Sequence, residues 1–239
     1  MSEVKIDVAF DLSSDLKGCD PDTYSQILKQ YHKQLWNKPL PNGSNFTLEC
    51  DWGYLCHKSG EAEHLLSSDT MVNTYGHWTR KAIHDICVTI PKEEMQRFVY
   101  AVNTIGNRIL FPRNRIDGKN TINQDRYFAE NIRDRFDLTL ECVRRYYADI
   151  ENPLKDTFQN YKKFFDLFTD FKGYCKFFLL QDLVSEDCSQ IKFFLPFDNF
   201  ESNPLPTNED EYRRYMQKSM EFISCRNARI ATDLKQRGL

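Results

Sequence analysis

The sequence has little glycine and little proline, nine of each in 239 residues. No apolar run approaches the roughly 18 residues that a membrane span needs, and the first ten residues alternate apolar and polar side chains instead of forming a signal-peptide core. Internal repeats and low-complexity tracts are also lacking. These absences disfavour a loop-rich scaffold and a membrane protein, and we expect a cytoplasmic protein.

Several signatures of chemistry are missing as well. The sequence contains no glycine-rich phosphate loop, no Gly-x-Gly nucleotide fingerprint and no metalloprotease or kinase motif. Its eight cysteines are scattered without a Cys-x-x-Cys pair, as expected of reduced, buried thiols. Cys50, Cys56, His57 and His64 have no familiar zinc spacing, so we favour buried thiols and surface histidines. We predict no metal site, and the sequence assigns no cofactor.

The composition is that of a folded globular chain. Hydrophobic residues make up 41% and charged residues 28%, with an unusually high aromatic content of 14%. The net charge of −3 excludes a globally basic nucleic-acid binder, so any nucleic-acid contact must be a local patch.

Hydrophobic periodicity and turn residues predict the elements. Strands are expected at 4–10, 46–56 (a hairpin or a pair of short strands), 83–90, 108–111, 177–180 and 191–195. Helices are expected from 20 to 38, 91 to 106, 126 to 147, 152 to 173 and 207 onward, and 57–82 is expected to be mostly loop. The predicted fold is α+β, a helix-rich single domain over 1–239 with a small mixed or antiparallel sheet.

The helix around residues 134–147 carries the strongest candidate site. Apolar residues cover most of its circumference, while Arg133, Asp137, Glu141 and Arg144 form one polar stripe. Charged groups on a mostly buried helix must be paired or must face a cavity. The stripe is therefore either an ion-pair network or a pocket. In a pocket, the arginines bind an anion, and Asp137 and Glu141 do acid–base work or orient a substrate or a metal.

The preceding loop adds further polar residues, namely Asn114, Arg115, Asn123 and Arg126. Each of them can simply bond to the backbone of a turn, but their density beside the helix suggests a shared pocket. We therefore predict Asp137 and Glu141 as catalytic residues. The predicted ligand-binding residues are Asn114, Arg115, Asn123, Arg126, Arg133 and Arg144.

Four sequence blocks resemble an uncharacterised bacterial protein family, a domain of unknown function. They are Tyr31-His32 with Leu35-Trp36-Asn37-Lys38-Pro39-Leu40-Pro41, Asn114-Arg115-Ile116-Asp117-Gly118 with Thr121-Ile122-Asn123, 134–142, and Phe177-Phe178-Leu179-Leu180-Gln181-Asp182-Leu183-Val184. The resemblance spans most of the chain and supports a single domain. It carries no catalytic residue over, because the family has no established activity.

Two functions follow as expectations. The first is a nucleotide- or nucleic-acid-directed protein, a hydrolase or transferase, that uses the Arg/Asp/Glu-lined pocket to bind a phosphate-bearing ligand or a nucleic acid. The alternative is a non-enzymatic module that binds a protein partner or assembles as a homo-oligomer. The sequence leaves open whether the protein is an enzyme.

Overall fold

The computed structural model describes residues 5–16, 21–51, 53–60, 62–77 and 81–239. The strands are β1 (Lys38–Pro39), β2 (Asn45–Phe46), β3 (Leu48–Asp51), β4 (Tyr54–Ser59), β5 (Ala62–Thr70) and β6 (Arg108–Pro112). The helices are α1 (Ser13–Leu16), α2 (Pro21–Tyr24), α3 (Gln26–Trp36), α4 (Lys81–Cys87), α5 (Lys92–Val102), α6 (Ile122–Phe128), α7 (Phe136–Tyr147), α8 (Lys155–Asn160), α9 (Lys162–Phe165), α10 (Phe171–Phe177) and α11 (Glu209–Gln236). Short 3₁₀ helices are η1 (Ile105–Asn107), η2 (Asp166–Phe168) and η3 (Gln181–Leu183).

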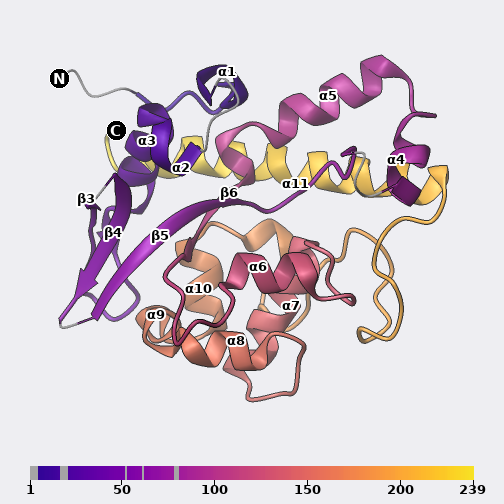
Figure 1. The fold of residues 1–239 in the computed structure, drawn as a ribbon. Helices are drawn as coiled ribbons and strands as arrows, with labels where there is room; N and C mark the ends of the chain where they lie inside the picture. Colours follow the sequence, from indigo (N-terminus) through magenta and orange to yellow (C-terminus); the bar gives the residue numbers. More distant parts are fainter. Residues whose placement is uncertain (1–4, 17–20, 52, 61, 78–80) are drawn as a thin grey trace.

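The main sheet is antiparallel with strand order β3-β4-β5-β6, and β1 pairs with β2 in a second small sheet. Helices predominate around these sheets (Figure 1). Three predictions are therefore confirmed: the helix-rich α+β fold, the hairpin within 46–56 and the strand at 108–111.

Local signals explain where the main helices begin. The Ser25 hydroxyl accepts from the Leu28 amide at 2.9 Å at the start of α3, and Asn208 does the same for Glu211 at the start of α11. These side chains satisfy amides that lack a partner in the first helical turn. The start of α6 has a full capping box between Thr121 and Gln124.

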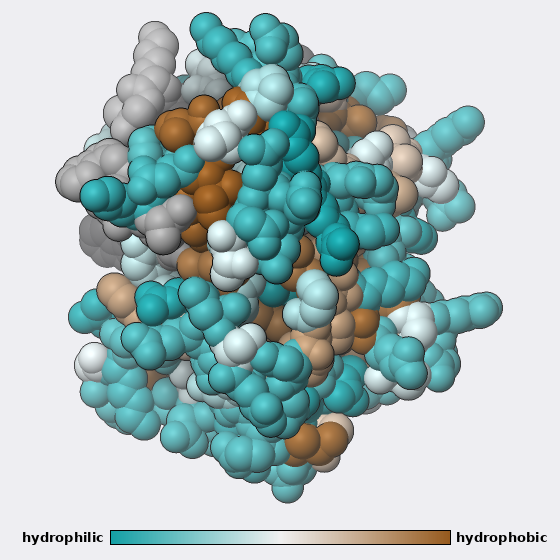
Figure 2. Space-filling model, turned by 90° about the vertical axis from the view of Figure 1, so that its right-hand side faces the viewer, coloured by the Kyte–Doolittle hydropathy of each residue, from teal (hydrophilic) through white to brown (hydrophobic). Residues whose placement is uncertain are grey.

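The aromatic residues between positions 158 and 178 pack into the core. Phe164, Phe165, Phe168 and Phe178 are fully buried, and their rings meet largely edge to face or tilted at about 5 Å. They join a continuous hydrophobic cluster that includes residues of the sheet and of α11. Hydrophilic side chains dominate the surface shown in Figure 2, where apolar ones appear only in small areas.

Helix α11 crosses the molecule between α5 and the group formed by α6 to α10 (Figure 1). Its fully buried Arg226 donates to the Gly106 and Arg108 carbonyls at 2.8 Å and to the Phe178 carbonyl at 2.9 Å. A Cβ on Gly106 would lie 2.8 Å from the Ile223 carbonyl oxygen, so only glycine permits this approach of α11. The helix thus connects both halves of the chain.

Several predicted elements were wrong. Residues 83–90 lie largely in α4, and the expected loop at 57–82 contains β5, the longest strand described. The part of 4–10 that the structure describes is not a strand, and the apolar runs near 177–195 form only the isolated bridge Val184–Ile191. The stretch 152–173 is divided into α8, α9 and η2, with Gly173 inside α10.

Candidate functional site

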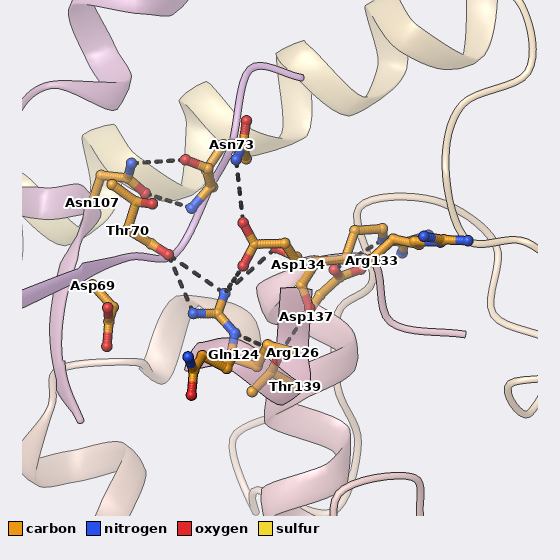
Figure 3. A network of polar contacts seen from close by, with 12 residues as sticks. Asp69, Thr70, Asn73, Asn107, Gln124, Arg126, Arg133, Asp134, Asp137 and Thr139 are labelled. Atoms are coloured by element: carbon orange, nitrogen blue, oxygen red, sulfur yellow. Dashed lines mark hydrogen bonds and ion pairs between the residues drawn. The ribbon is translucent and has the colours of Figure 1, made fainter. Parts of the chain in front are cut away.

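Arg126 is the centre of a buried polar network (Figure 3). Its side chain is fully buried, and Nη2 lies 3.2 Å from the Asp134 carboxylate. Nε donates to Thr139 Oγ1 at 3.1 Å, and the guanidinium also donates to the Thr70 carbonyl at 3.4 Å. Asn73 donates to the second Asp134 oxygen at 3.2 Å. Protein groups enclose the Arg126 guanidinium, so it cannot reach a ligand in solvent.

The backbone between α6 and α7 contains two successive residues in the left-handed region. Arg133 has φ of 47° and Asp134 has φ of 68°. The Asp134 amide donates to the Arg126 carbonyl at 2.8 Å, which ends the helical path at this turn. The helix predicted from 126 to 147 is therefore broken, and Arg133 points away from Arg126, towards Glu130 at 3.4 Å (Figure 3).

Asp137 lies in the first turn of α7 and is fully buried beside Arg135. The Arg135 Nε and Nη2 atoms donate to its two carboxylate oxygens, and Nη1 donates to the Pro204 carbonyl at 2.7 Å. Asp137 also accepts from the Phe194 amide at 2.9 Å. Burial alone would lower the pKa of Arg135, but the charge and hydrogen bonds of Asp137, together with Tyr75 and Tyr215, outweigh burial and raise that pKa. The pair holds the segment 194–204 against α7.

Glu141 lies two turns along α7 and is almost fully buried. It accepts from Arg144 Nε at 2.7 Å and Nη2 at 2.8 Å, and from Arg145 Nε at 2.7 Å. Burial alone would raise the pKa of Glu141, but these hydrogen bonds hold the pKa of the carboxyl below its usual value. Arg144 and Glu141 thus form an ion pair with each other.

The remaining predicted ligand-binding residues lie apart from this network. Asn114, Arg115 and Asn123 are exposed. No hydrogen bond or ion pair that the structure describes joins their side chains to Asp137 or Glu141. A pocket of about 330 Å³ lies nearby at Arg135 and Leu138, but none of the predicted site residues lines it, and its wall is mainly the segment 195–207. The contacts of the polar stripe on α7 fit an ion-pair network rather than a pocket. The catalytic roles of Asp137 and Glu141 stay predictions.

A larger cleft lies elsewhere, between β1, α10, η3 and α11. Its volume is about 1090 Å³. Its apolar wall includes Pro39, Leu40, Phe177, Leu179 and Ala228, and its basic residues are Lys38, Lys172, Lys176 and Arg229. Pockets that bind small organic ligands have a similar size and mixture of walls. We name it the Lys38 cleft.

The carboxylates of the Lys38 cleft already have partners. Asp182 receives two hydrogen bonds from Arg229, at 2.7 and 3.0 Å. Asp170 accepts from the Gly173 amide at 2.6 Å, and Asp233 lies 3.0 Å from Arg237 Nε. Within the described part of the chain, the structure gives no ion pair for three cleft lysines, which are Lys38, Lys172 and Lys176. The cleft therefore has a surplus of positive charge.

Lys38 is half-buried, and its Nζ lies over two aromatic rings. The distance from Nζ to the ring centroid is 4.9 Å for Trp36 and 5.0 Å for Phe177. Burial lowers the pKa of Lys38 to about 8, aided by Arg237 and Arg226 and opposed by Asp233. Close to neutral pH, an appreciable fraction of this amine is uncharged.

The sequence alone does not reveal this cleft. Its walls come from residues 38–41, 170–182 and 225–236, which only the fold brings together. The available signal was weak: Lys38 lies in a sequence block that resembled the family, and Lys172 and Lys176 are four residues apart on α10. Such a spacing is common on exposed helix faces.

His32 and Ser68 lie close together in the core without forming a nucleophilic pair. The His32 Nε2 atom is 2.6 Å from Ser68 Oγ, and Trp36 Nε1 donates to His32 Nδ1 at 3.0 Å. Because Nδ1 accepts from Trp36, the proton of the neutral ring is on Nε2, which therefore cannot accept the hydroxyl proton. Burial lowers the pKa of His32 to about 3. We interpret this contact as structural.

His57 and His64 are not surface histidines as predicted. They are cross-strand partners on β4 and β5, with ring centroids 6.3 Å apart, and both are buried. Burial lowers the pKa of His64 to about 4. Among the residues that the structure describes, no three His, Cys, Asp or Glu side chains gather into a group able to hold a metal ion.

A protein-family model matches residues 6–230. The chain belongs to DUF6994, a family of unknown function. The predicted resemblance to an uncharacterised family is thereby confirmed, while its bacterial origin stays a prediction. DUF6994 membership covers the network and nearly all of the Lys38 cleft but assigns a role to neither. Neither the curated proteins nor the solved structures include a match to the chain.

Within the described ranges, no helix of this DUF6994 chain is both long and apolar enough to cross a membrane. The longest, α11, carries charged residues along its length. The cytoplasmic location stays a prediction.

Proposed function

We propose that the protein binds a phosphate-bearing small molecule, of the nucleotide or sugar-phosphate class, in the Lys38 cleft. The observation that carries this proposal is the surplus of basic groups there: Lys172 and Lys176 face the cleft without an ion pair among the described residues. An ammonium group binds phosphate as a point charge. The apolar wall accommodates the organic part of the ligand.

The sequence predicts the anion on Arg115, Arg126, Arg133 and Arg144. Of these arginines, Arg126 is fully buried and paired with Asp134, and Arg144 is paired with the buried Glu141. Binding an anion there requires breaking buried ion pairs, which typically costs several kcal/mol. Binding an anion at Lys172 and Lys176 breaks no ion pair among the described residues. The proposal therefore keeps a phosphate-bearing ligand but places it in the Lys38 cleft.

A thermal-shift screen tests the proposal with mononucleotides, dinucleotides, sugar phosphates, short RNA and DNA, and divalent metals. A ligand at 100 times its Kd stabilises the fold by about 2.7 kcal/mol, which corresponds to a Tm rise of roughly 5–10 °C for a chain of this size. We expect the rise for a phosphate ester and its loss in the double variant Lys172→Ala/Lys176→Ala.

Matched controls separate the cleft from the predicted site. Lys58→Ala/Lys192→Ala removes the same charge from exposed positions outside the cleft and should keep the shift. A shift that survives Lys172→Ala/Lys176→Ala but disappears in Arg133→Ala would overturn the proposal in favour of the α7 stripe.

Cys225 offers a second, local measurement. It is exposed and lines the cleft, whereas Cys50 is exposed on β3 outside it. The bound ligand should slow iodoacetamide alkylation of Cys225 several-fold and leave that of Cys50 unchanged, as followed by peptide mass spectrometry. Equal rates with and without ligand would place the ligand elsewhere.

The alternative function, a non-enzymatic interaction or self-assembly module, stays a prediction. Solution mass by light scattering tests its self-assembly form directly. A strictly monomeric chain that gives a ligand-dependent shift would count against it.

A further inference from the structure

We propose that Lys38 condenses with an aldehyde or ketone group on the ligand of the cleft to form an imine. This inference rests on the proposed function, because it assigns a reactive group to the same cleft. It extends that function from binding to covalent chemistry, and it narrows the ligand class to phosphorylated carbonyl compounds.

Lys38 is positioned to meet a ligand in the cleft. It directly precedes Pro39 in β1, and both residues line the cleft. Nζ is held over the faces of Trp36 and Phe177, and both rings are buried. No carboxylate in the described ranges lies within ion-pair distance of Nζ. The amine is therefore placed at the cleft wall without being neutralised by a fixed partner.

The protonation state of Lys38 favours attack on a carbonyl group. Only the free amine has the lone pair that attacks a carbonyl carbon. The groups that act on Lys38 are Asp233 and Arg226 on α11 and Arg237 just after it, and burial has the largest effect. With a pKa of about 8, roughly a tenth of the amine is free at pH 7, against less than a thousandth for an ordinary lysine.

The lysines of the cleft fall into two sets with different roles. Lys172 and Lys176 are exposed on α10 and remain available to bind a phosphate. Lys38 lies deeper against the aromatic rings. A ligand with an anionic group at one end and a carbonyl at the other can contact both sets of lysines.

The reaction balances without an oxidant or reductant. The Nζ lone pair forms a bond to the carbonyl carbon while the carbonyl oxygen takes a proton, which gives a carbinolamine. The carbon–oxygen bond then breaks and water leaves as the nitrogen loses its proton, so one amine and one carbonyl give one imine and one water. Solvent at the open cleft exchanges the protons.

Reductive trapping tests the proposal on the full chain. The protein is incubated with pyridoxal 5′-phosphate or with pyridoxal, reduced with borohydride, digested and analysed by mass spectrometry. We expect Lys38 to be labelled at least tenfold more than the exposed Lys58 and Lys192. Its labelling rate should rise up to about pH 8 and then level off, whereas the rate at exposed lysines keeps rising. Equal labelling of all three lysines, or a Lys38 rate without the plateau, overturns the inference.

Two variants and two ligands distinguish failure of the imine from failure of the proposed function. Lys38→Arg retains the cation over the rings and should abolish the label, while Lys176→Arg should retain it. Phosphate esters that shift the Tm without labelling Lys38 overturn the imine and leave the proposed function standing. Equal Lys38 labelling by pyridoxal and its phosphate, with no Tm shift by any phosphate ester, overturns the proposed function and supports only the reactive lysine.

Discussion

At the scale of single residues, the charged side chains of α7 differ in how completely they are enclosed. Asp137 and Arg135 have almost no exposed surface, whereas Arg144 and Arg145 keep 26% and 15% of theirs. A charge that loses its partner can recover hydration only where it reaches water. The two ion-pair groups on one helix should therefore respond differently to neutralisation.

Asp137→Asn should cost about 3–5 kcal/mol in the free energy of unfolding, because it leaves the Arg135 charge buried without a counter-charge. Glu141→Gln should cost less, about 1–2 kcal/mol, because Arg144 and Arg145 can turn to solvent. Urea denaturation measures both. Glu130→Gln is the matched control: Glu130 is 90% exposed, so the change should stay within about 0.5 kcal/mol. An Asp137→Asn chain as stable as the wild type would contradict the ion-pair interpretation.

His32 should make the fold sensitive to acid. Its pKa is about 3 in the folded chain, against about 6.5 when unfolded. Between these values the unfolded chain binds a proton that the folded chain does not, so stability is complete above pH 6.5 and falls as the pH falls. The loss from this residue should reach roughly 2 kcal/mol at pH 5.

Urea unfolding at pH 7.5, 6 and 5 measures this effect. His32→Gln removes the titrating group, so its stability should fall less steeply between pH 7.5 and 5 than that of the wild type. His64, with a lowered pKa of about 4, acts in the same direction over this pH range and is present in both proteins, so the comparison isolates His32. The same slope in both proteins would show that His32 is not held neutral.

At the scale of elements, α11 packs very closely against η1. Among the described glycines, Gly106 in η1 has the shortest distances from an added Cβ to a segment far away in the sequence. Gly106→Ala would place a Cβ 2.8 Å from the Ile223 carbonyl oxygen and 2.4 Å from Asn227 Oδ1. The asparagine side chain can move, but the helix backbone cannot move alone. We expect a loss of about 1–3 kcal/mol, as for other overpacked sites, measured by urea denaturation.

Gly76→Ala is the matched control for that prediction. A Cβ at Gly76 would meet nothing closer than Thr74 Oγ1 at 3.8 Å, and Gly76 has no left-handed backbone. Its stability should change by less than about 0.5 kcal/mol. If both alanine variants lose the same amount, backbone freedom rather than the approach of α11 explains the effect.

At the scale of the whole molecule, the helices and strands that could be predicted are those marked by residues within or next to them. Pro91 and the first-turn glutamates mark α5, and the apolar run before Pro112 marks β6. Strand β5 was missed because Ser67, Ser68 and Asp69 are polar, and it is pairing with β6 and packing against α3 that bury this part of the strand. Propensity cannot report burial that tertiary pairing imposes.

The candidate sites show the same division. The polar stripe of α7 was recognised from helical spacing, but its partners were not: Arg135 pairs within the stripe's own turn, and Arg145 competes with Arg144 for Glu141. The helix is broken at Asp134, where Arg126 and Asn73 hold the backbone and side chain by hydrogen bonds. Hydrophobic periodicity does not report such contacts. The Lys38 cleft requires three segments to meet, so no single stretch of sequence encodes it.

The position of α11 in the chain has a consequence for biosynthesis. This helix supplies Tyr212 to the Thr74 carbonyl, Tyr215 to the Asn73 carbonyl and Arg226 to carbonyls of both halves. The ribosome makes α11 after every element that these contacts join. The nascent chain must therefore wait with its apolar surfaces uncovered until residue 230 or so has left the exit tunnel. The fold is complete only once α11 has emerged, and a chaperone that shields apolar surface during that interval should raise its yield.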